Sequence, residues 1–470
     1  MIVSPVFAGK RFAVLGLARS GMTAVRTLLE SGAYVMAWDS REEPRQVLAA
    51  DVAAGRCELA DPVSADLAGY DGLVVSPGVP LNRHPIAEAA RRANVPLIGD
   101  IELFALARES LPDHRVVGIT GTNGKSTTTS LVRHLVEQAG LPVRMGGNIG
   151  LPVLGTVPLE PNDKGPGVYV LELSSYQIDL TRSLDCDVAA LLNITPDHLD
   201  RYAGFPEYAA SKARLFEMQG ASRAAVFGIG DEQTRAVAIR EEARHGAGLV
   251  RQVDGADIAA LQNDWPSLQG PHNLQNAAVA VAIVEALGIA RESWEPALRS
   301  FRGLPHRMER VAEVDGVLYI NDSKATNPAS AAPAIAAFPP DPNPRIHWIV
   351  GGLPKGEDLD ECKPWFGNIA AAYTIGDAGP LFAELLEPHT RVVRSEMMAQ
   401  AIRQAMDAAR PGDVIMLSPA CASFDQFRDY EARGQAFRQI VEALLAPEES
   451  EGEGRGEDDT AGAGRAGGDD

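Results

Sequence analysis

The chain has 470 residues, of which 45% are hydrophobic and 23% are charged; it is too long for one ordinary hydrophobic core and favours a globular protein of three domains. Its formal net charge of −20 argues against a general binder of nucleic acids or anionic membranes, because both need a basic surface. The four cysteines are far apart and no apolar run reaches the roughly 20 residues of a membrane helix, so we expect a soluble cytoplasmic protein without a disulfide framework or zinc site.

A βαβ unit is predicted at the start of the chain. Its parts are a strand at residues 11–16, a glycine-containing turn to Gly21, a helix at 22–31 and a strand at 33–38. Asp39 follows about 20 positions after the turn, where a Rossmann-like site places a carboxylate on ribose hydroxyls. Ala18 replaces the second glycine of the GxGxxG pattern, so a purely structural turn is as well supported as a nucleotide site.

Two α/β domains are predicted up to residue 303. Short apolar strands at 72–76 and 95–98 complete the first domain, which we place at residues 1–102. A strand at 115–120 and a helix at 126–139 open the second domain, placed at residues 103–303, and strands at 168–173 and 188–193 continue it.

The strongest chemical signal lies between the strand at 115–120 and the helix that follows. The residues there are Gly118-Ile119-Thr120-Gly121-Thr122-Asn123-Gly124-Lys125-Ser126-Thr127. Glycines let backbone N–H groups wrap around phosphates, Lys125 places a cation on them, and the Ser126 hydroxyl can hold Mg²⁺. The first glycine of the strict GxxxxGK[ST] pattern would fall on Ile119, so the match rests on Gly-Lys-Ser and its strand–loop–helix setting. The loop predicts ATP binding.

Two polar segments follow later strands of this domain. Glu172 ends an apolar strand in Leu171-Glu172-Leu173-Ser174-Ser175-Tyr176-Gln177, where a buried acid needs a partner such as Mg²⁺ or the end of a helix. The segment Asn193-Ile194-Thr195-Pro196-Asp197-His198-Leu199-Asp200-Arg201-Tyr202 places His198 where α/β sheets bind ligands. Lys212 follows in a helix, and its position alone is that of a solvated surface lysine.

A third doubly wound domain is predicted at residues 304–446, with strands at 317–321, 347–351, 373–376 and 413–418. Two polar segments directly follow strands: Asn321-Asp322-Ser323-Lys324-Ala325-Thr326-Asn327-Pro328 and Ser418-Pro419-Ala420-Cys421-Ala422-Ser423-Phe424-Asp425-Gln426-Phe427. They suit a ligand crevice at the strand ends, although helix caps use the same residue types. Residues 447–470 are Glu, Gly, Ala and Asp with almost no apolar bulk, which predicts a disordered acidic tail.

Taken in order, GTNGKST, LELSSYQ, NITPDHLDRY with Lys212, PHNLQN, GLPHR, NDSKATNP and SPACASFDQFRDYEARG resemble the motifs of the Mur ligase family. The resemblance reaches from the first domain to about residue 446. It implies an α/β fold of three Rossmann-like or P-loop-like doubly wound domains with mainly parallel sheets, which bind a UDP-substrate, ATP and an amino acid in that order. The last two motifs are most similar to those of members that join D-glutamate to UDP-N-acetylmuramoyl-L-alanine through an acyl phosphate, releasing ADP and phosphate in peptidoglycan precursor synthesis.

The resemblance also implies roles for individual residues at the ATP site. Catalytic roles fall to Lys125, Glu172, His198, Lys212 and Lys324. The metal ligands would be Ser126, Glu172, His198 and Lys212, holding two Mg²⁺ ions for which Mn²⁺ can substitute, with Lys212 carbamylated. ATP contacts would come from Gly121, Thr122, Asn123, Gly124, Lys125, Ser126, Thr127, Asn276, Arg307, Asp322 and Lys324.

For the other two substrates, the family pattern points to further residues. D-Glutamate would meet Thr326, Lys355, Ser423, Phe424 and Tyr430, and Lys355 is a cation suited to a side-chain carboxylate. The UDP-substrate would meet Leu17, Ala18, Asp39, Ser40, Arg41, Asn148 and Ser174. The implied protein acts on small molecules without nucleic-acid or membrane partners, as a monomer.

Three alternatives remain open at this point. Another Mur enzyme or a folylpolyglutamate synthase would share the phosphate loop, a nicotinamide-dependent dehydrogenase would use the first βαβ unit, and an ATP-regulated switch would bind nucleotide without turnover. The missing glycine weakens the dehydrogenase, which also leaves the Gly-Lys-Ser loop unexplained.

Overall fold

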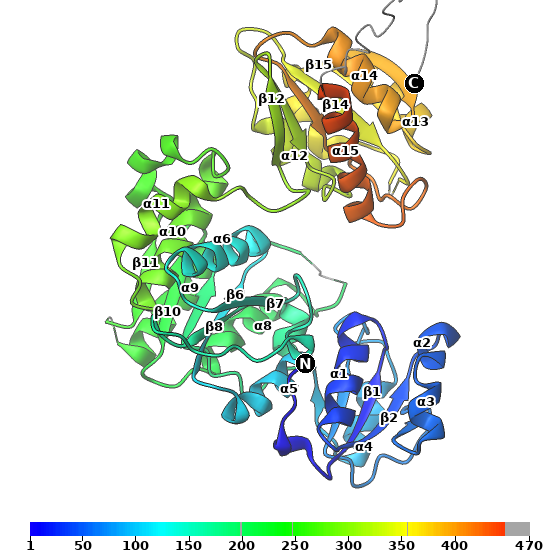
Figure 1. Cartoon of the computed structure of the whole chain (residues 1–470), viewed down its shortest axis with the longest axis vertical. Coiled ribbons are helices and arrows are strands. Elements are labelled where there is room, and N and C mark those ends of the chain that lie inside the picture. The colour runs from blue at the N-terminus through cyan, green and yellow to red at the C-terminus, as the bar shows by residue number, and fades with distance from the viewer. Residues whose placement is uncertain (198–199, 247, 355, 447–470) are drawn as a thin grey trace, which may run out of the picture. The chain divides into compact units, whose positions relative to one another are not determined.

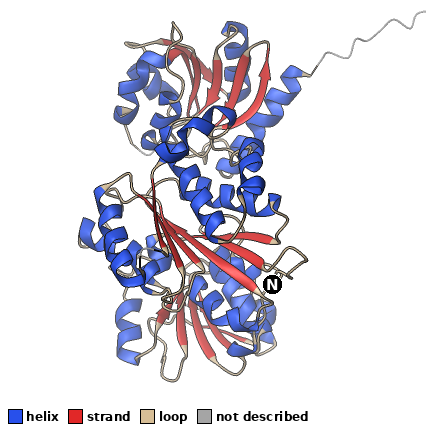
Figure 2. Ribbon diagram, turned by 90° about the vertical axis from the view of Figure 1, so that its left-hand side faces the viewer, coloured by secondary structure: helices blue, strands red, loops and turns tan. Residues whose placement is uncertain are grey.

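The computed structural model describes residues 1–197, 200–246, 248–354 and 356–446. It divides into two compact units, Met1–Glu309 and the part from Arg310 onward, and contains three sheets in which every strand pair with an assigned direction is parallel (Figure 1). Helices lie on both sides of the strands (Figure 2). The predicted α/β class with three mainly parallel sheets is confirmed, whereas the domain limits at 102, 303 and 446 stay predictions. The predicted tail lies outside the described residues.

The first sheet has the order β3-β2-β1-β4-β5 and is parallel throughout. Its strands are β1 Arg11–Leu15, β2 Tyr34–Trp38, β3 Cys57–Leu59, β4 Gly72–Val75 and β5 Leu97–Ile98, with helices α1 Arg19–Glu30, α2 Glu42–Gln46, α3 Ala49–Ala53 and α4 Ile86–Ala93. The strand order reverses between β1 and β4, and the turn at Gly16 lies there, at the place where doubly wound sheets bind ligands. A Cβ on Gly16 would lie 2.9 Å from Ser76, and its φ of 87° also favours glycine.

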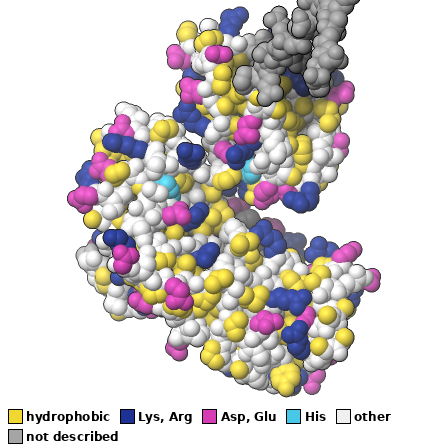
Figure 3. Space-filling model, in the orientation of Figure 1, with side chains coloured by type: hydrophobic (Ala, Val, Ile, Leu, Met, Phe, Trp, Pro, Cys, Tyr) yellow, Lys and Arg dark blue, Asp and Glu magenta, His cyan; other side chains and the backbone are white. Residues whose placement is uncertain are grey.

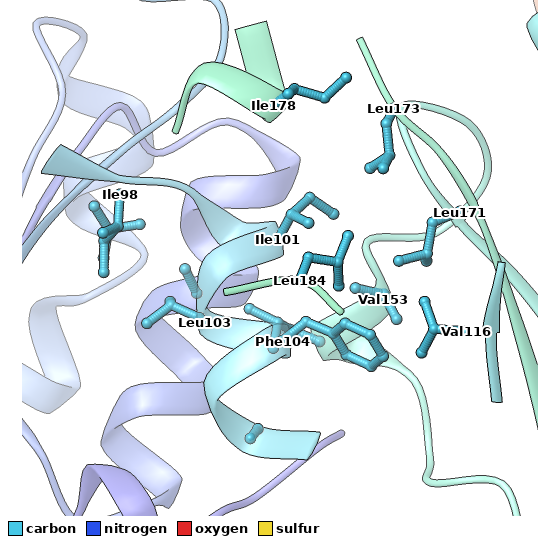
Figure 4. Packing of buried hydrophobic residues seen from close by; sticks show 14 of the residues in the cluster. Ile98, Ile101, Leu103, Phe104, Val116, Val153, Leu171, Leu173, Ile178 and Leu184 are labelled. Carbon is cyan, nitrogen blue, oxygen red and sulfur yellow. The ribbon is translucent and has the colours of Figure 1, made fainter. Parts of the chain in front are cut away.

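Helix α5 (Asp100–Ala107) follows the first sheet and packs into the core that the first two sheets share. Figure 4 shows its side chains Ile101 and Phe104 among residues of the second region, Val116, Val153, Leu171, Leu173 and Leu184. At its start, the Gly99 amide donates to the Leu180 carbonyl at 2.9 Å. The two sheets are therefore joined by one continuous apolar cluster in which α5 is fixed.

The second sheet has the order β11-β10-β9-β6-β8-β7 and is also parallel. Its strands are β6 His114–Thr120, β7 Val143–Gly147, β8 Gly167–Glu172, β9 Val188–Leu191, β10 Ala224–Gly228 and β11 Val250–Val253. Its helices are α6 Lys125–Gln138, α7 Ser175–Asp179, α8 Phe205–Glu217, α9 Glu232–His245, α10 Pro271–Ala286 and α11 Arg291–Ser300. Strands β6, β8 and β9 are neighbours, so the loops after them converge at one edge of the sheet.

The third sheet has the order β12-β13-β17-β14-β15-β16. Its strands are β12 Glu309–Val314, β13 Val317–Asn321, β14 Ile346–Gly351, β15 Ile369–Ile375, β16 Arg391–Glu396 and β17 Val414–Leu417, with helices α12 Pro328–Ala336, α13 Gly379–Leu386, α14 Met398–Ala408 and α15 Tyr430–Leu445. Only Asp315 and Gly316 separate β12 from β13, with φ of 52° and 75°, the backbone of a tight antiparallel hairpin.

Several predicted boundaries were wrong. Helix α1 begins at Arg19 rather than at residue 22, because Ala18 already has the extended backbone of a residue that precedes a helix. Strand β15 begins at Ile369 and not at 373. The strands β3, β7, β10, β11, β12 and β16 were not predicted.

Candidate active site

The phosphate loop connects β6 to α6 as the sequence predicts. Gly124 immediately precedes the helix with φ of 82°, and a Cβ there would lie 2.2 Å from Oδ1 of Asn276. This glycine is therefore required both by the backbone conformation and by the approach of α10. Ser126 and Thr127 are half-buried in the first turn of α6, where unpaired helix N–H groups favour a phosphate.

The segment after β9 forms hydrogen bonds with the phosphate loop. Thr122 N–H donates to the Asn193 carbonyl at 2.9 Å, and Asn123 N–H donates to the Asn193 side chain at 2.8 Å. The Asn193 amide donates back to the Asn123 carbonyl at 3.0 Å. The Thr122 hydroxyl also lies 3.1 Å from the hydroxyl of Tyr208. Asn193 and Tyr208 thus shape the loop, although the sequence assigned neither a role.

Two lysine amines meet at one backbone carbonyl of the loop. Lys125 Nζ donates to the Gly121 carbonyl at 2.9 Å and to the Thr122 carbonyl at 2.7 Å. Lys212 Nζ, from α8, donates to the same Gly121 carbonyl at 2.9 Å. Burial lowers the pKa of Lys125, against the opposing charges of Glu172 and Asp197. The structure therefore brings Lys212 to the phosphate loop, as the resemblance implies.

The interpretation of Lys212 as a solvated surface lysine was wrong. Its side chain is only 2% exposed, and its Nζ lies 4.6 Å from the centre of the Tyr208 ring. Burial first, and then the charge of Lys125, lower the pKa of Lys212 to about 7. Tyr208 precedes Lys212 by four residues on α8, a spacing that places both on one helix face. That spacing is the sequence signal that could have identified Tyr208.

Glu172 ends β8 beside the loop and is 2% exposed. Its Oε1 accepts from Asn148 Nδ2 at 2.9 Å, while its Oε2 is buried without a hydrogen-bond partner among the described residues. The alternative role as a helix cap is wrong, because Ser174 caps α7 and accepts from Gln177 N–H at 3.2 Å. A buried carboxylate oxygen without a donor is a site where a cation fits.

Asn276 and Arg307 lie near the phosphate loop. Asn276 is 7% exposed on α10 and contacts the Gly124 position, as described above. Arg307 is close enough for its charge to lower the pKa of Lys125. His198, the remaining predicted metal ligand of this cluster, lies outside the described residues.

The predicted UDP-substrate residues form a second cluster, after β1 and β2. Asp39 is 7% exposed and accepts from Leu17 N–H at 2.7 Å and from Arg41 N–H at 3.0 Å. Burial would raise the pKa of Asp39, but these hydrogen bonds and the Arg41 charge outweigh it and lower the pKa. Ala18 and Ser40 are exposed beside them. Because its carboxylate accepts from these backbone N–H groups, Asp39 stabilises the turn. This contact fits a purely structural turn as well as it fits a nucleotide site.

Asn148 and Ser174 belong instead with Glu172. Asn148 N–H donates to the Glu172 carbonyl at 2.8 Å, and its side chain is exposed. Ser174 forms a reciprocal capping box with Gln177 at the start of α7. Both residues therefore lie close to the phosphate-loop edge of the second sheet.

In the unit from Arg310 onward, the two predicted segments follow neighbouring strands. Strands β13 and β17 pair with Asn321 opposite Leu417, and the Ser418 hydroxyl donates to Asp322 at 2.7 Å. Lys324 is exposed with its Nζ 4.1 Å from the centre of the Tyr430 ring. The remaining predicted D-glutamate residues are the half-buried Thr326, the buried Ser423 and the 69% exposed Phe424. Lys355 lies outside the described residues.

Arg433 of α15 joins these segments and was missed by the sequence interpretation. It is 1% exposed and donates to the Ser323 hydroxyl and carbonyl at 3.0 and 2.8 Å, and to the Cys421 and Ala422 carbonyls at 3.0 and 3.1 Å. Burial lowers its pKa to about 10. No local sequence signal identifies it, because the groups that it contacts belong to other segments of the chain.

Two further features are the distribution of charge on the surface and the length and polarity of the helices. On the face drawn in Figure 3, basic side chains are interspersed with acidic ones. Among the described residues, every helix is too short or too polar to cross a membrane.

Three family models match the chain in succession. They are the MurD-like N-terminal domain of Mur ligases at residues 10–99, the Mur ligase middle domain at 119–284, and the Mur ligase glutamate ligase domain at 306–421. Two similar curated proteins are named UDP-N-acetylmuramoylalanine--D-glutamate ligase. The protein from Novosphingobium aromaticivorans is 66% identical over 96% of this chain and 98% of its own length, and that from Sphingopyxis alaskensis is 56% identical over 95% and 100%.

Solved structures show the same fold at low sequence identity. UDP-N-acetylmuramate-alanine ligase MurC from Thermotoga maritima is 16% identical with a TM-score of 0.54, covering 93% of this chain and 99% of its own. The MurF ligase from Thermotoga maritima in complex with ADP has the same identity and TM-score, covering 94% and 96%. From the three family matches and the two relatives that align along nearly its full length, the chain belongs to the Mur ligase family.

Proposed function

We propose that the chain is an ATP-dependent ligase that joins D-glutamate to UDP-N-acetylmuramoyl-L-alanine in peptidoglycan precursor synthesis. The observation that carries this proposal is the name shared by relatives 66% and 56% identical over almost the whole chain. The buried Glu172 and Lys212 and the half-buried Lys125 around the phosphate loop supply chemistry that fits it.

The residues at the loop fit Mg²⁺. Oε2 of Glu172 is buried without a protein donor, and Ser126 lies in the first turn of α6; carboxylates, hydroxyls and phosphate oxygens are the ligands that Mg²⁺ prefers. We assign Ser126 and Glu172 to one ion, and His198 and a carbamylated Lys212 to a second, with Mn²⁺ as a substitute. When bound, these ions would neutralise the charge of the transferring phosphoryl group.

The environment of Lys212 supports its carbamylation. An amine must be neutral to attack CO₂, and a pKa of about 7 leaves a large neutral fraction at physiological pH. The reaction forms a nitrogen–carbon bond and releases one proton, which turns a possible cation into an anion. An anion at this position can hold a metal ion where an ammonium group would repel it.

The proposed reaction has two steps. The alanyl carboxylate attacks the γ-phosphorus of ATP, which gives an acyl phosphate and ADP; Lys125, from the phosphate loop, stabilises the transferring charge. The amine of D-glutamate then attacks the acyl carbon, loses a proton, and displaces phosphate from a tetrahedral intermediate. Arg307, Asp322, Asn276 and Lys324 are assigned to the nucleotide and its phosphates.

The other proposed contacts follow the two remaining clusters. Thr326, Lys355, Ser423, Phe424 and Tyr430 are assigned to D-glutamate. The UDP-substrate is assigned to Leu17, Ala18, Asp39, Ser40, Arg41, Asn148 and Ser174. We further propose a cytoplasmic monomer that supports cell-wall biogenesis and thereby cell shape and division.

The test is an assay of phosphate release with ATP and Mg²⁺. Release should require UDP-N-acetylmuramoyl-L-alanine and D-glutamate together, and omission of either should reduce it to background. A preference for L-lysine or diaminopimelate over D-glutamate would overturn the proposed amine. Titration with NADH in the same experiment tests the dehydrogenase, which predicts an absorbance change that the ligase does not.

A further inference from the structure

Helix α5 carries two buried acids, Glu102 and Asp100, which differ in how well hydrogen-bond donors satisfy their carboxylates. Glu102 is 4% exposed, and its carboxylate accepts from Arg182 N–H at 2.6 Å, Ser183 N–H at 3.0 Å and the Ser183 hydroxyl at 2.8 Å. These three donors satisfy the carboxylate, so Glu102 fastens α5 to the segment after α7.

Asp100 is 3% exposed, yet neither of its carboxylate oxygens has a hydrogen bond of ordinary geometry among the described residues. Burial raises the pKa of Asp100 to about 6, so the group remains mostly ionised at neutral pH. A buried charge whose nearby donors are not in good hydrogen-bond geometry costs free energy. Such groups in native structures often mark sites where function is favoured over stability.

The side chains beside Asp100 come from two substrate-binding regions. The backbone N–H groups of Ile101 and of Asp100 itself, and the side chains of Gln177 and Ser20, lie close enough to the carboxylate to favour its ionised form. Ser20 is the second residue of α1, directly after the turn that carries Leu17 and Ala18. Gln177 accepts from Ser174 N–H at 3.2 Å and from the Ser174 hydroxyl at 3.1 Å through its Oε1, which leaves its amide nitrogen as the group that can donate to Asp100.

The backbone on which Asp100 sits is fixed. Gly99 N–H donates to Leu180 at 2.9 Å, and a Cβ on Gly99 would lie 3.1 Å from the Leu180 side chain. The following turn of α5 is packed in the shared core through Ile101 and Phe104 (Figure 4). The carboxylate is therefore a fixed acceptor, and the side chains of Ser20 and Gln177 are the parts that can adjust to it.

We propose that Asp100 is a positioning residue for the UDP-substrate, whose carboxylate accepts hydrogen bonds of good geometry from Ser20 and Gln177 when that substrate is bound and so aligns the Gly16–Ala18 turn and the start of α1 with the Ser174 cap. The inference rests on the proposed function, which assigns the UDP-substrate to Leu17 and Ala18 on one side and to Ser174 on the other. Binding brings these nearby donors into good hydrogen-bond geometry, and the free-energy cost of the buried charge is recovered at that step.

The first experiment compares Asp100→Asn with the matched control Glu102→Gln on the same helix. Asp100→Asn should raise the KM for UDP-N-acetylmuramoyl-L-alanine about 10-fold, the effect of one lost charge-assisted hydrogen bond, with kcat and the KM for ATP within about twofold. Without ligands it should also raise Tm by about 2 °C or more, because a buried charge is removed. Glu102→Gln should lower Tm and leave the KM for this substrate unchanged.

A second variant keeps the proposal testable if Asp100→Asn does not fold. Ser20→Ala removes a half-buried hydroxyl and should raise the same KM; in the double variant the two increases should not multiply, because both remove one interaction. An unchanged KM in Asp100→Asn, or in Ser20→Ala where Asp100→Asn does not fold, alongside an active unaltered protein would overturn the role of Asp100 alone. An unaltered protein that does not ligate this substrate would overturn the proposed function and, with it, this inference.

Discussion

Replacing Lys212 by Met removes a buried amine and keeps an unbranched side chain of similar length, and we expect it to stabilise the protein near neutral pH. The pKa of Lys212 is about 7 in place of the ordinary 10.5. This difference corresponds to a folding cost of about 5 kcal/mol at and below pH 7. The hydrogen bond to the Gly121 carbonyl and the contact with the Tyr208 ring would be lost, at about 1 kcal/mol each. The net gain is roughly 3 kcal/mol.

The sign of the pH dependence follows from the lowered pKa. Between pH 7 and pH 10.5 the unfolded chain carries more protons on Lys212 than the folded chain does, so stability rises with pH across that window. The advantage of Met over Lys should therefore be largest at pH 7 and below. It should shrink as the pH rises and be gone, or slightly reversed, near pH 10.5.

The assay is urea unfolding of both proteins at pH 6.5 and pH 10 in buffers free of CO₂, which prevents carbamylation of the unaltered lysine. Titrating groups that do not interact with Lys212 are common to the two proteins and cancel in the difference. A Met variant that is less stable at pH 6.5, or a difference that is equal at the two pH values, would refute the lowered pKa. In the phosphate-release assay the same variant should be at least about 100-fold slower, because it lacks the proposed metal-holding carbamate.

Three further changes test the two units separately. Glu172→Gln should reduce kcat by about 100-fold or more while the folded chain stays intact, since a neutral amide is a poor Mg²⁺ ligand; turnover within threefold of the unaltered protein contradicts the metal assignment. Gly124→Ala should weaken ATP binding by at least about 10-fold in calorimetry, because the new Cβ meets Asn276; unaltered affinity would show that the loop adapts. Arg433→Met should destabilise the unit from Arg310 onward by about 3 kcal/mol in urea unfolding. Four charge-assisted hydrogen bonds are lost at about 1.5 kcal/mol each, which outweighs the roughly 3 kcal/mol folding cost that the lowered pKa of Arg433, about 10, implies. A loss under 1 kcal/mol would count against this role.

The sequence predicted the central strands better than the edges of the sheets. Strand β13 was predicted at its observed limits, and the strand–loop–helix of β6 and α6 was placed to within one residue. Five of the six strands that were missed are edge strands: β3, β7, β11, β12 and β16. An edge strand has a neighbouring strand on one side only and is more exposed to solvent. Polar residues therefore interrupt the apolar run that identifies a central strand. Strand β10 is buried and apolar, so its apolar run could have been recognised in the sequence.

The sequence predicted those site residues whose chemical groups and structural signals, such as glycines or a strand end, lie within one short segment. The loop from Gly121 to Ser126 has that property, and so does Glu172 at the end of its strand. Lys212 does not, because its helix is polar on several faces and only the fold shows that this lysine points inward. Arg433 was missed for the same reason: its four acceptors come from segments more than ten residues away in the sequence, which no local pattern reports.

The shared carbonyl of Gly121 has a consequence for proton uptake. Because Lys125 and Lys212 each donate to it at 2.9 Å, their nitrogen atoms are no further apart than twice that distance, and protonation of one opposes protonation of the other. The two lysine amines together therefore bind fewer than two titrating protons near neutral pH. In buffer free of CO₂, where Lys212 keeps its amine, an arriving anionic phosphate offsets that opposition. Nucleotide binding should then draw a proton from solution, and the heat of binding should change with the ionisation enthalpy of the buffer.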